Sequence, residues 1–216
     1  LIITPEGVSD ECGITALTVP ESVDYIELRN MSNLTNITLP ETAVLAEGCF
    51  SGCYQIEDLA IPKGNQTLYG VCVGRTAHVV LPDDVLEVRG PISSGNSSLK
   101  SIDLGSVRVL TDGALSDCVA LERVTLPDSL IELGDGVFSG CAQLRSVKGG
   151  GNVRQIGNSC FSACPALTDF GDLTANVTRV GSLAFFNTGW FHDQPNGVVY
   201  FGKAAYAYKG TMPEGT

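Results

Sequence analysis

The sequence has few charged side chains, and fewer of them are basic than acidic. Charged residues make up 17% of the chain, below the ~25% typical of soluble domains. The formal net charge is -11, from 24 acidic and 13 basic residues. Because this charge repels phosphate groups and anionic headgroups, we expect neither nucleic acid nor a membrane surface as a partner.

Long apolar runs are also missing. The longest, such as Val198 to Phe201 and Ala204 to Tyr208, fall far short of the ~20 residues that a membrane-spanning helix needs. We therefore expect no membrane insertion. The chain starts at Leu1 without Met or a charged-then-apolar leader, so we expect a mature or trimmed fragment.

Histidine is scarce, which limits the catalytic chemistry that the chain can offer. A nucleophilic Cys or Ser needs a base within hydrogen-bond reach, and only His78 and His192 are present, neither in a nucleophile motif. Adjacent carboxylates such as Asp83 and Asp84 point to opposite faces of a strand, which suits surface charges better than a paired acid and base. The sequence therefore predicts a protein that is not an enzyme, with no catalytic residues and no cofactor.

The most informative feature is an internal repeat. The stretch from Leu121 to Pro127 is matched by Leu34 to Pro40 and by Ile56 to Pro62. The first position of this template recurs at steps of 20 to 23 residues, at Ile14, Leu34, Ile56, Thr76, Leu99, Leu121, Leu144 and Leu167. Repetition at such a period is typical of solenoid proteins.

A second motif follows the same period. It reads Phe-Ser-small-Cys at Phe50 to Cys53, Phe138 to Cys141 and Phe161 to Cys164. Each coil then has a short strand, a proline turn, a second apolar segment and a compact turn with Phe and Cys. One coil cannot bury its apolar face alone, but stacked coils can, at the ~4.8 Å strand spacing. We predict a right-handed solenoid of about eight coils, with a short parallel sheet on one face and mostly irregular or short helical turns on the other.

The repeat resembles that of the BspA-like bacterial leucine-rich repeats. The shared pattern is L-x-x-I-x-L-P-x-x-V-x-x-I-G-x-x-A-F-x-x-C, and Leu121 to Cys141 and Leu144 to Cys164 are its closest copies. The resemblance covers roughly residues 14 to 190. It implies a bacterial, exported, surface-associated protein, since members of the family act as adhesins for host or matrix proteins. The shortened coil from Pro62 to Pro82 and the stretch Val147 to Gly151 depart from the pattern, so we expect a kink or bulge there.

The pattern changes after the last coil. We divide the chain into a solenoid over residues 1–192 and a C-terminal segment over 193–216, either a hairpin cap or a link to further repeats. Within it, Gly197 to Tyr208 predicts two short strands around a Gly-Lys turn. Besides capping the solenoid, this end could offer a docking surface built on Trp190, Phe191, Tyr200 and Tyr208.

The eight cysteines invite a disulfide interpretation, but their spacing favours another. Cys118, Cys141 and Cys164 recur at steps of 23 residues, where stacked coils would bury small apolar side chains. We expect reduced, buried thiols. The close pair Cys49 and Cys53 is spaced like a metal or redox pair, but zinc requires more ligands than the sequence places nearby, so we expect no metal.

The best candidate site is the outer face of the predicted sheet. Outward residues of successive coils should align in two columns, which gives a candidate protein-binding face of Asn36, Asp58, His78, Asp103, Arg123, Lys148 and Asp169. Most outward residues are small and polar, whereas strong protein-binding faces carry aromatic or arginine anchors. A plain solvated surface therefore remains the alternative.

These observations lead to a functional hypothesis with two rivals. We expect an extracellular or cell-surface bacterial module that binds a protein ligand of the host or the extracellular matrix. One alternative is a structural spacer within a longer surface protein. The other is a carbohydrate-binding module, for which Trp190 beside Phe191 is the place to look.

Overall fold

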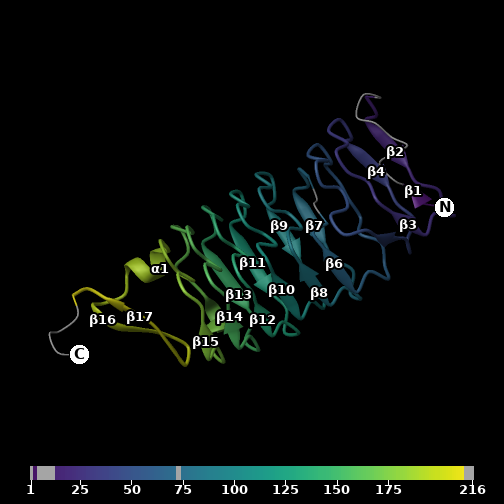
Figure 1. The fold of residues 1–216 in the computed structure, drawn as a ribbon. Coiled ribbons are helices and arrows are strands. Elements are labelled where there is room, and N and C mark those ends of the chain that lie inside the picture. Colours follow the sequence, from purple (N-terminus) through teal and green to yellow (C-terminus); the bar gives the residue numbers. More distant parts are fainter. Residues whose placement is uncertain (1, 4–12, 72–73, 212–216) are drawn as a thin grey trace.

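The computed structural model describes residues 2–3, 13–71 and 74–211, which form one elongated stack of coils (Figure 1). Residues 2–3 and residues 197–209 lie at opposite ends of the stack. A typical coil has one short strand, a turn, a second short strand and a longer turn. The prediction of a solenoid of stacked coils with parallel strands is therefore confirmed. Cys12 and Cys72 lie outside the described residues.

One side of the stack carries the strands that the repeat template predicts, here called the first strand row. Its strands are β2 (Ala16–Thr18), β4 (Asn36–Thr38), β7 (His78–Val80), β9 (Ser101–Asp103), β11 (Arg123–Leu126) and β13 (Ser146–Gly149). They pair in parallel, β2 with β4, β7 with β9 and β11 with β13. Isolated parallel bridges from Asn36 to Asp58 and from Ser146 to Asp169 extend the row to two further coils.

Proline follows the first strand in several coils and begins the turn toward the second. The carbonyl oxygens of Pro20, Pro82 and Pro127 each accept a hydrogen bond from the N–H three residues further on, at 3.0, 3.0 and 3.1 Å. Proline has no N–H to donate to a neighbouring strand, so the ladder ends where the chain must turn.

A second strand row runs along another side of the stack, where irregular or short helical turns had been expected. It consists of β1 (Ile2–Ile3), β3 (Tyr25–Ile26), β5 (Val44–Leu45), β6 (Thr67–Tyr69), β8 (Glu87–Arg89), β10 (Val109–Thr111), β12 (Glu132–Leu133), β14 (Gln155–Ile156) and β15 (Arg179–Val180). The strands from β6 to β15 form one six-stranded parallel sheet. Segments of two or three residues are too short to form the internal hydrogen bonds of a helix, but they can pair with the next coil.

Helices contribute little to the fold. The described chain contains the short 3-10 helix η3 (Gly171–Thr174) and the helix α1 (Gly189–His192). Neither is long and apolar enough to cross a membrane, and no other helix in the described ranges is. The third side of the stack, here called the turn side, is built from the Phe- and Cys-containing turns between the second strand of one coil and the first strand of the next.

The interior is filled by ladders of like residues. The buried rings of Phe138 and Phe161 stack at 5.4 Å between centroids with 8° between planes, and Phe161 and Phe185 stack at 5.8 Å with 6°. Each of these side chains is fully buried. Aromatic pairs at such distances add ~0.5–1.5 kcal/mol to the stabilisation from burial. The repeat thus packs each coil with the same contacts as the one before.

Cysteine forms a second ladder beside the phenylalanines. The described cysteines Cys49, Cys53, Cys118, Cys141, Cys160 and Cys164 are free and buried. The Cys118 thiol donates to the carbonyl oxygen of Ser93, and the Cys164 thiol to that of Phe138, both at 3.0 Å. Burial raises the pKa of Cys49 and of Cys164 to about 12. These thiols are protonated structural groups, since the thiolate is the form that reacts and binds metals.

The shortened coil from Pro62 to Pro82 interrupts the second strand row. The sheet of β1, β3 and β5 ends at this coil, and the six-stranded sheet begins with β6. Between them Leu45 donates its N–H to the side chain of Asn65 at 2.9 Å rather than to a strand. At the other departure from the repeat, β13 keeps its parallel register with β11 as far as Gly149.

An antiparallel hairpin of β16 (Gly197–Phe201) and β17 (Ala204–Lys209) lies against the last coil. Phe201 packs on Phe185, with ring centroids 4.4 Å apart, and on Trp190 at 5.2 Å. The Tyr206 hydroxyl accepts a hydrogen bond from the Phe185 N–H at 3.0 Å. The hairpin and α1 therefore cover the end of the Phe ladder with aromatic side chains.

Candidate functional site

The candidate face lies on the first strand row, and the strand register produces the two columns of outward residues. In the first column Ala16 pairs with Asn36 and Asn36 with Asp58, then His78 with Ser101. The column continues from Arg123 through Ser146 to Asp169, and in the second column Val80 pairs with Asp103 and Thr125 with Lys148. All seven candidate residues are exposed. The geometry brings them onto one face, although no ligand defines it as a binding site.

Some of the seven side chains serve the local structure. Asp103 and Asp169 each accept a hydrogen bond from the backbone N–H two residues further on, at 3.0 Å, where the strand ends. Asn36 accepts one from the Thr35 hydroxyl at 2.8 Å. These groups are held as turn and surface residues, which leaves less of the face free to contact a partner.

His78 and Ser101 are in direct contact on this face. The imidazole Nδ1 of His78 lies 2.7 Å from the Ser101 hydroxyl oxygen. Asp58 stands before His78 in the column, but within the described chain its carboxylate forms no ion pair with the imidazole. All three side chains are exposed to water. A catalytic triad needs a carboxylate bound to the base, so this row does not form one.

The most distinctive chemistry on the face is a group of exposed cations, here called the basic cluster: Lys100, Arg123, Arg145 and Lys148. Arg123 pairs in register with Ser146, and Lys148 pairs with Thr125, so Arg123 and Lys148 lie on the adjoining strands β11 and β13. Arg145 directly precedes β13. Lys100 directly precedes β9, one coil before β11. Between Lys100, Arg123 and Glu122 the surface is hollowed by about 600 Å³.

The four cations of the basic cluster form no ion pair within the described residues, although Glu122 lies beside Arg123 and lines the same hollow. The ion pairs found among the described residues are Arg29 with Glu27, Arg89 with Glu87 and His192 with Asp193, none of which belongs to it. The chain has a net charge of -11, so this group of cations without ion pairs is a positively charged patch on a mostly negative protein. This part of the face therefore favours an acidic ligand.

Sequence reasoning found Arg123 and Lys148 but missed Lys100 and Arg145. Both missed residues directly follow the first leucine of the template, one position before the strand begins. Only the alternating strand positions were considered as outward. The missing signal was the exposure of the residue at the strand entrance.

The other predicted sites take a different role or lie inside the core. Trp190 and Phe191 are only partly exposed, and Trp190 packs edge to face on Phe170 at 5.8 Å. Tyr200 is 63% exposed, on the opposite side of its strand from buried Phe201. Trp190 is therefore part of the aromatic cover on the last coil, not a free platform for a sugar. No group of three or more His, Cys, Asp or Glu side chains arranged to hold a metal occurs within the ranges described.

Coils that carry two rows of parallel strands, with the leucine template facing inward, define a solenoid of leucine-rich repeats. The family model described as the BspA type leucine-rich repeat region matches residues 6–79 and 72–191, with six copies. The chain belongs to this family.

Solved structures of bacterial leucine-rich repeat proteins are similar in fold. One from Bacteroides ovatus is 22% identical with a TM-score of 0.66, and the match covers 81% of this chain and 53% of that one. This chain thus spans about half the length of that relative. Matches to proteins from T. pallidum (20% identical, TM-score 0.45, 72% and 78% covered) and Eubacterium ventriosum (16%, 0.46, 81% and 61%) are weaker. No curated protein sequence matches.

Proposed function

We propose that this chain is a non-enzymatic interaction module of an exported bacterial surface protein, and that it binds a protein ligand on its first strand row. Membership of the leucine-rich repeat family supports a protein-binding or structural role. The basic cluster of Lys100, Arg123, Arg145 and Lys148 is the observation that favours protein binding over a purely structural role. The ligand of this proposal is a host or matrix protein that presents an acidic segment.

The rigid backbone of the row supports this mechanism. Parallel pairing holds β11 and β13 at the ~4.8 Å spacing of a sheet, so the backbone positions from which Arg123 and Lys148 project are fixed before any ligand arrives. Because the backbone of this site is already ordered, less of the interaction free energy is lost to ordering it when a ligand binds. The remaining acidic surface repels an acidic segment elsewhere, which directs encounter to the basic cluster.

The test is a pull-down of host surface and matrix proteins with the intact chain and with the triple variant Arg123→Ala, Arg145→Ala and Lys148→Ala. The matched control removes three exposed arginines of the second strand row side, Arg108, Arg154 and Arg179. We expect the first variant to lose affinity by about threefold to a hundredfold, since exposed ion pairs contribute ~0.2–1 kcal/mol each. The control should bind like the intact chain, and equal losses in both variants would contradict the proposal.

A structural spacer is the second candidate. The outward residues of the first strand row other than the basic cluster are mostly small, such as Ala16, Thr38, Ala60 and Thr125. A spacer needs only a soluble, rigid stack. Failure of the intact chain to capture any protein in the same pull-down would favour it.

A further inference from the structure

One carboxylate lies among the cations of the basic cluster. Glu122 directly precedes β11, as Lys100 precedes β9 and Arg145 precedes β13. The Arg145 N–H donates to the Glu122 carbonyl oxygen at 2.9 Å, so these two residues are neighbours on adjoining coils. Arg123 follows Glu122 on the same strand and lines the same hollow, together with Lys100. The carboxylate therefore interrupts the positive charge of the cluster.

The alternation of charge is confined to this part of the stack. The residues that directly follow the first position of each template are here called the entrance column: Thr15, Thr35, Glu57, Ala77, Lys100, Glu122, Arg145 and Thr168. Lys100, Glu122 and Arg145 give the order cation, carboxylate, cation on three successive coils, and all three are exposed. Glu57 is the other charged member, and the members before and after it are uncharged.

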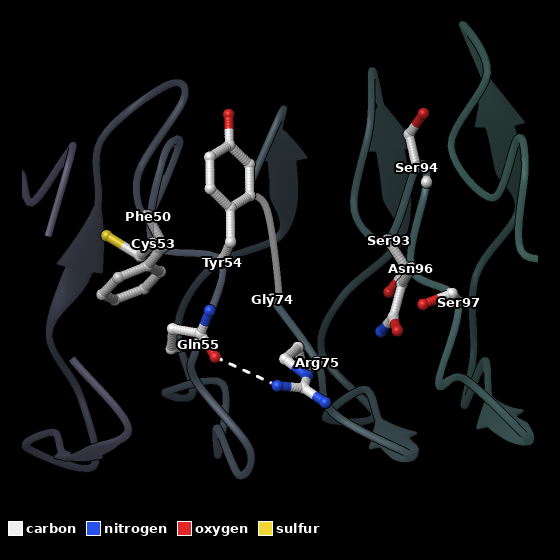
Figure 2. A pocket seen from close by; sticks show the side chains of 11 residues that line it. Phe50, Cys53, Tyr54, Gln55, Gly74, Arg75, Ser93, Ser94, Asn96 and Ser97 are labelled. Atoms are coloured by element: carbon white, nitrogen blue, oxygen red, sulfur yellow. Dashed lines mark hydrogen bonds between the residues drawn. The ribbon is translucent and has the colours of Figure 1, made fainter. Parts of the chain in front are cut away.

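The three charged side chains are available to a ligand. Within the described residues, Lys100, Glu122 and Arg145 form no ion pair. The hollow between them, about 600 Å³ in volume, keeps the space open. An exposed arginine of the turn side differs in this respect, because Arg75 donates to the side-chain oxygen of Gln55 at 3.1 Å, as the dashed line in Figure 2 shows.

The spacing of these charges decides which backbone shape can meet all three. Successive coils are ~4.8 Å apart, so Lys100 and Arg145 are separated by two steps, or ~9.6 Å along the stack. Side chains at positions i and i+7 of an α-helix lie on one face, ~10.5 Å apart along its axis. Residues on one face of an extended strand lie ~6.8 Å apart at i and i+2, and ~13.6 Å apart at i and i+4. A helix that runs along the stack therefore fits the entrance column better than a strand.

We propose that the acidic segment bound here is an α-helix that carries an acidic residue at position i, a basic residue at i+3 or i+4, and an acidic residue at i+7. This inference rests on the proposed function, because it names the chemistry of the ligand for the same face. The acidic residues meet Lys100 and Arg145, and the basic residue meets Glu122. The segment keeps a net negative charge, which suits the remaining cations Arg123 and Lys148.

Glu122 gives the face its selectivity. A continuous polyanion places one of its charges against this carboxylate, and like charges at an interface are unfavourable. A basic group at the same place gains an ion pair instead. Repulsion of the wrong partner is one of the two ways in which an interface becomes specific. The face thus discriminates a helix of alternating charge from a uniformly acidic one.

Two alanine-rich peptides of about 25 residues, long enough to form helices in isolation, test the proposal. Both have three Glu and one Lys. The first carries Glu, Lys and Glu on one face and the third Glu on the opposite face, and the second exchanges this Lys with that third Glu. Net charge and composition are therefore equal, and circular dichroism checks that helix content is equal too. Fluorescence anisotropy of the labelled peptides gives their affinities for the intact chain.

We expect the intact chain to bind the first peptide about threefold or more tightly than the second, since one exposed ion pair is gained and one like-charge contact is avoided. Glu122→Lys should reverse this preference. Glu57→Lys is the matched control, because it makes the same change of charge in the same column away from the cluster, and it should keep the preference of the intact chain. Equal binding of the two peptides, no binding of either, or an unchanged preference in Glu122→Lys would overturn the inference.

Failure of the inference can be told apart from failure of the proposed function. If both peptides bind equally, and Arg123→Ala, Arg145→Ala and Lys148→Ala together weaken both, an acidic ligand on this face stands and the helix of alternating charge is rejected. The same holds if neither peptide binds but the pull-down captures a protein through these three cations. A pull-down in which the triple variant captures as much protein as the intact chain rejects the binding face itself.

Discussion

The side chain of Asn65 accepts the hydrogen bond that Leu45 would otherwise donate to a neighbouring strand: the Leu45 N–H donates to the Asn65 side-chain oxygen at 2.9 Å. The amide nitrogen of the same side chain donates to the carbonyl oxygens of Ala43 and Pro62, at 2.9 and 3.0 Å. Asn65 is 5% exposed. One buried amide thus connects two coils where the second strand row is interrupted.

Asn65→Leu should destabilise the protein strongly. The substitution keeps the volume but leaves the Leu45 N–H and two carbonyl oxygens without partners, each at a cost of ~1–3 kcal/mol if no water reaches it. We expect a loss of about 2–4 kcal/mol in the free energy of unfolding, measured by urea denaturation. Asn33→Leu, at an exposed position, is the control and should change stability by less than about 0.5 kcal/mol.

Ala163→Gly should stabilise the protein. Ala163 has φ +57°, in the left-handed region, at the position where two other coils carry Gly52 and Gly140. This conformation costs an L-residue ~1–2 kcal/mol, and glycine avoids that cost against a loss of ~0.4–1 kcal/mol in chain entropy. A rise in Tm is expected. Ala166→Gly, in the same turn without positive φ, should lower it, and a fall in both variants would refute the strain at Ala163.

Alkaline pH should weaken the fold through the buried thiols. The pKa of Cys49 and of Cys164 is raised by burial from 9.0 to about 12, so the folded state holds these protons more tightly than the unfolded state. Their contribution is complete below pH 9.0 and is lost as the pH rises toward about 12. We expect Tm to fall more steeply above pH 9.0 than in the Cys49→Ala, Cys164→Ala variant. Equal slopes would show that these thiols do not control the loss.

Phe201→Ala should release the C-terminal end of the stack. The ring lies 4.4 Å from that of Phe185, and its removal exposes the last rung of the Phe ladder at a cost of ~3–5 kcal/mol. Because repeat coils contact mainly their neighbours, we expect the loss of protection in hydrogen exchange to concentrate in the hairpin and the last coil. Tyr200→Ala, on the exposed side of the same strand, should leave the exchange pattern unchanged.

Binding through the basic cluster should depend on salt. Exposed charges are screened over a Debye length of ~10 Å at 0.1 M salt and ~3 Å at 1 M. We expect the affinity for an acidic protein ligand to fall as salt is raised, chiefly through slower association, in surface plasmon resonance. An affinity that is independent of salt would assign the contact to apolar residues such as Val80, which is 63% exposed.

Much of the fold could be predicted because each coil repeats the same sequence template and therefore the same local structure. The pairing of Arg123 with Ser146 and of Thr125 with Lys148 follows from the 23-residue step, since stacked coils place equivalent residues side by side. The burial of Phe138 and Cys141 follows in the same way. The division at residue 192 and the binding role of the seven candidate residues stay predictions.

The candidate sites were less predictable, because they depend on where the repeat fails. Trp190 looked like an exposed aromatic in the sequence, but the end of the Phe ladder leaves apolar surface that Trp190 and Phe201 cover. Lys100 and Arg145 joined the basic cluster only once the strand entrances were placed.

The sequence by itself determined the solenoid, the register of the first strand row and the burial of the Phe and Cys ladders, because these follow from a local period. The tertiary structure decided the second strand row and the cover on the last coil. Each of these depends on how one coil meets a neighbour that differs from it.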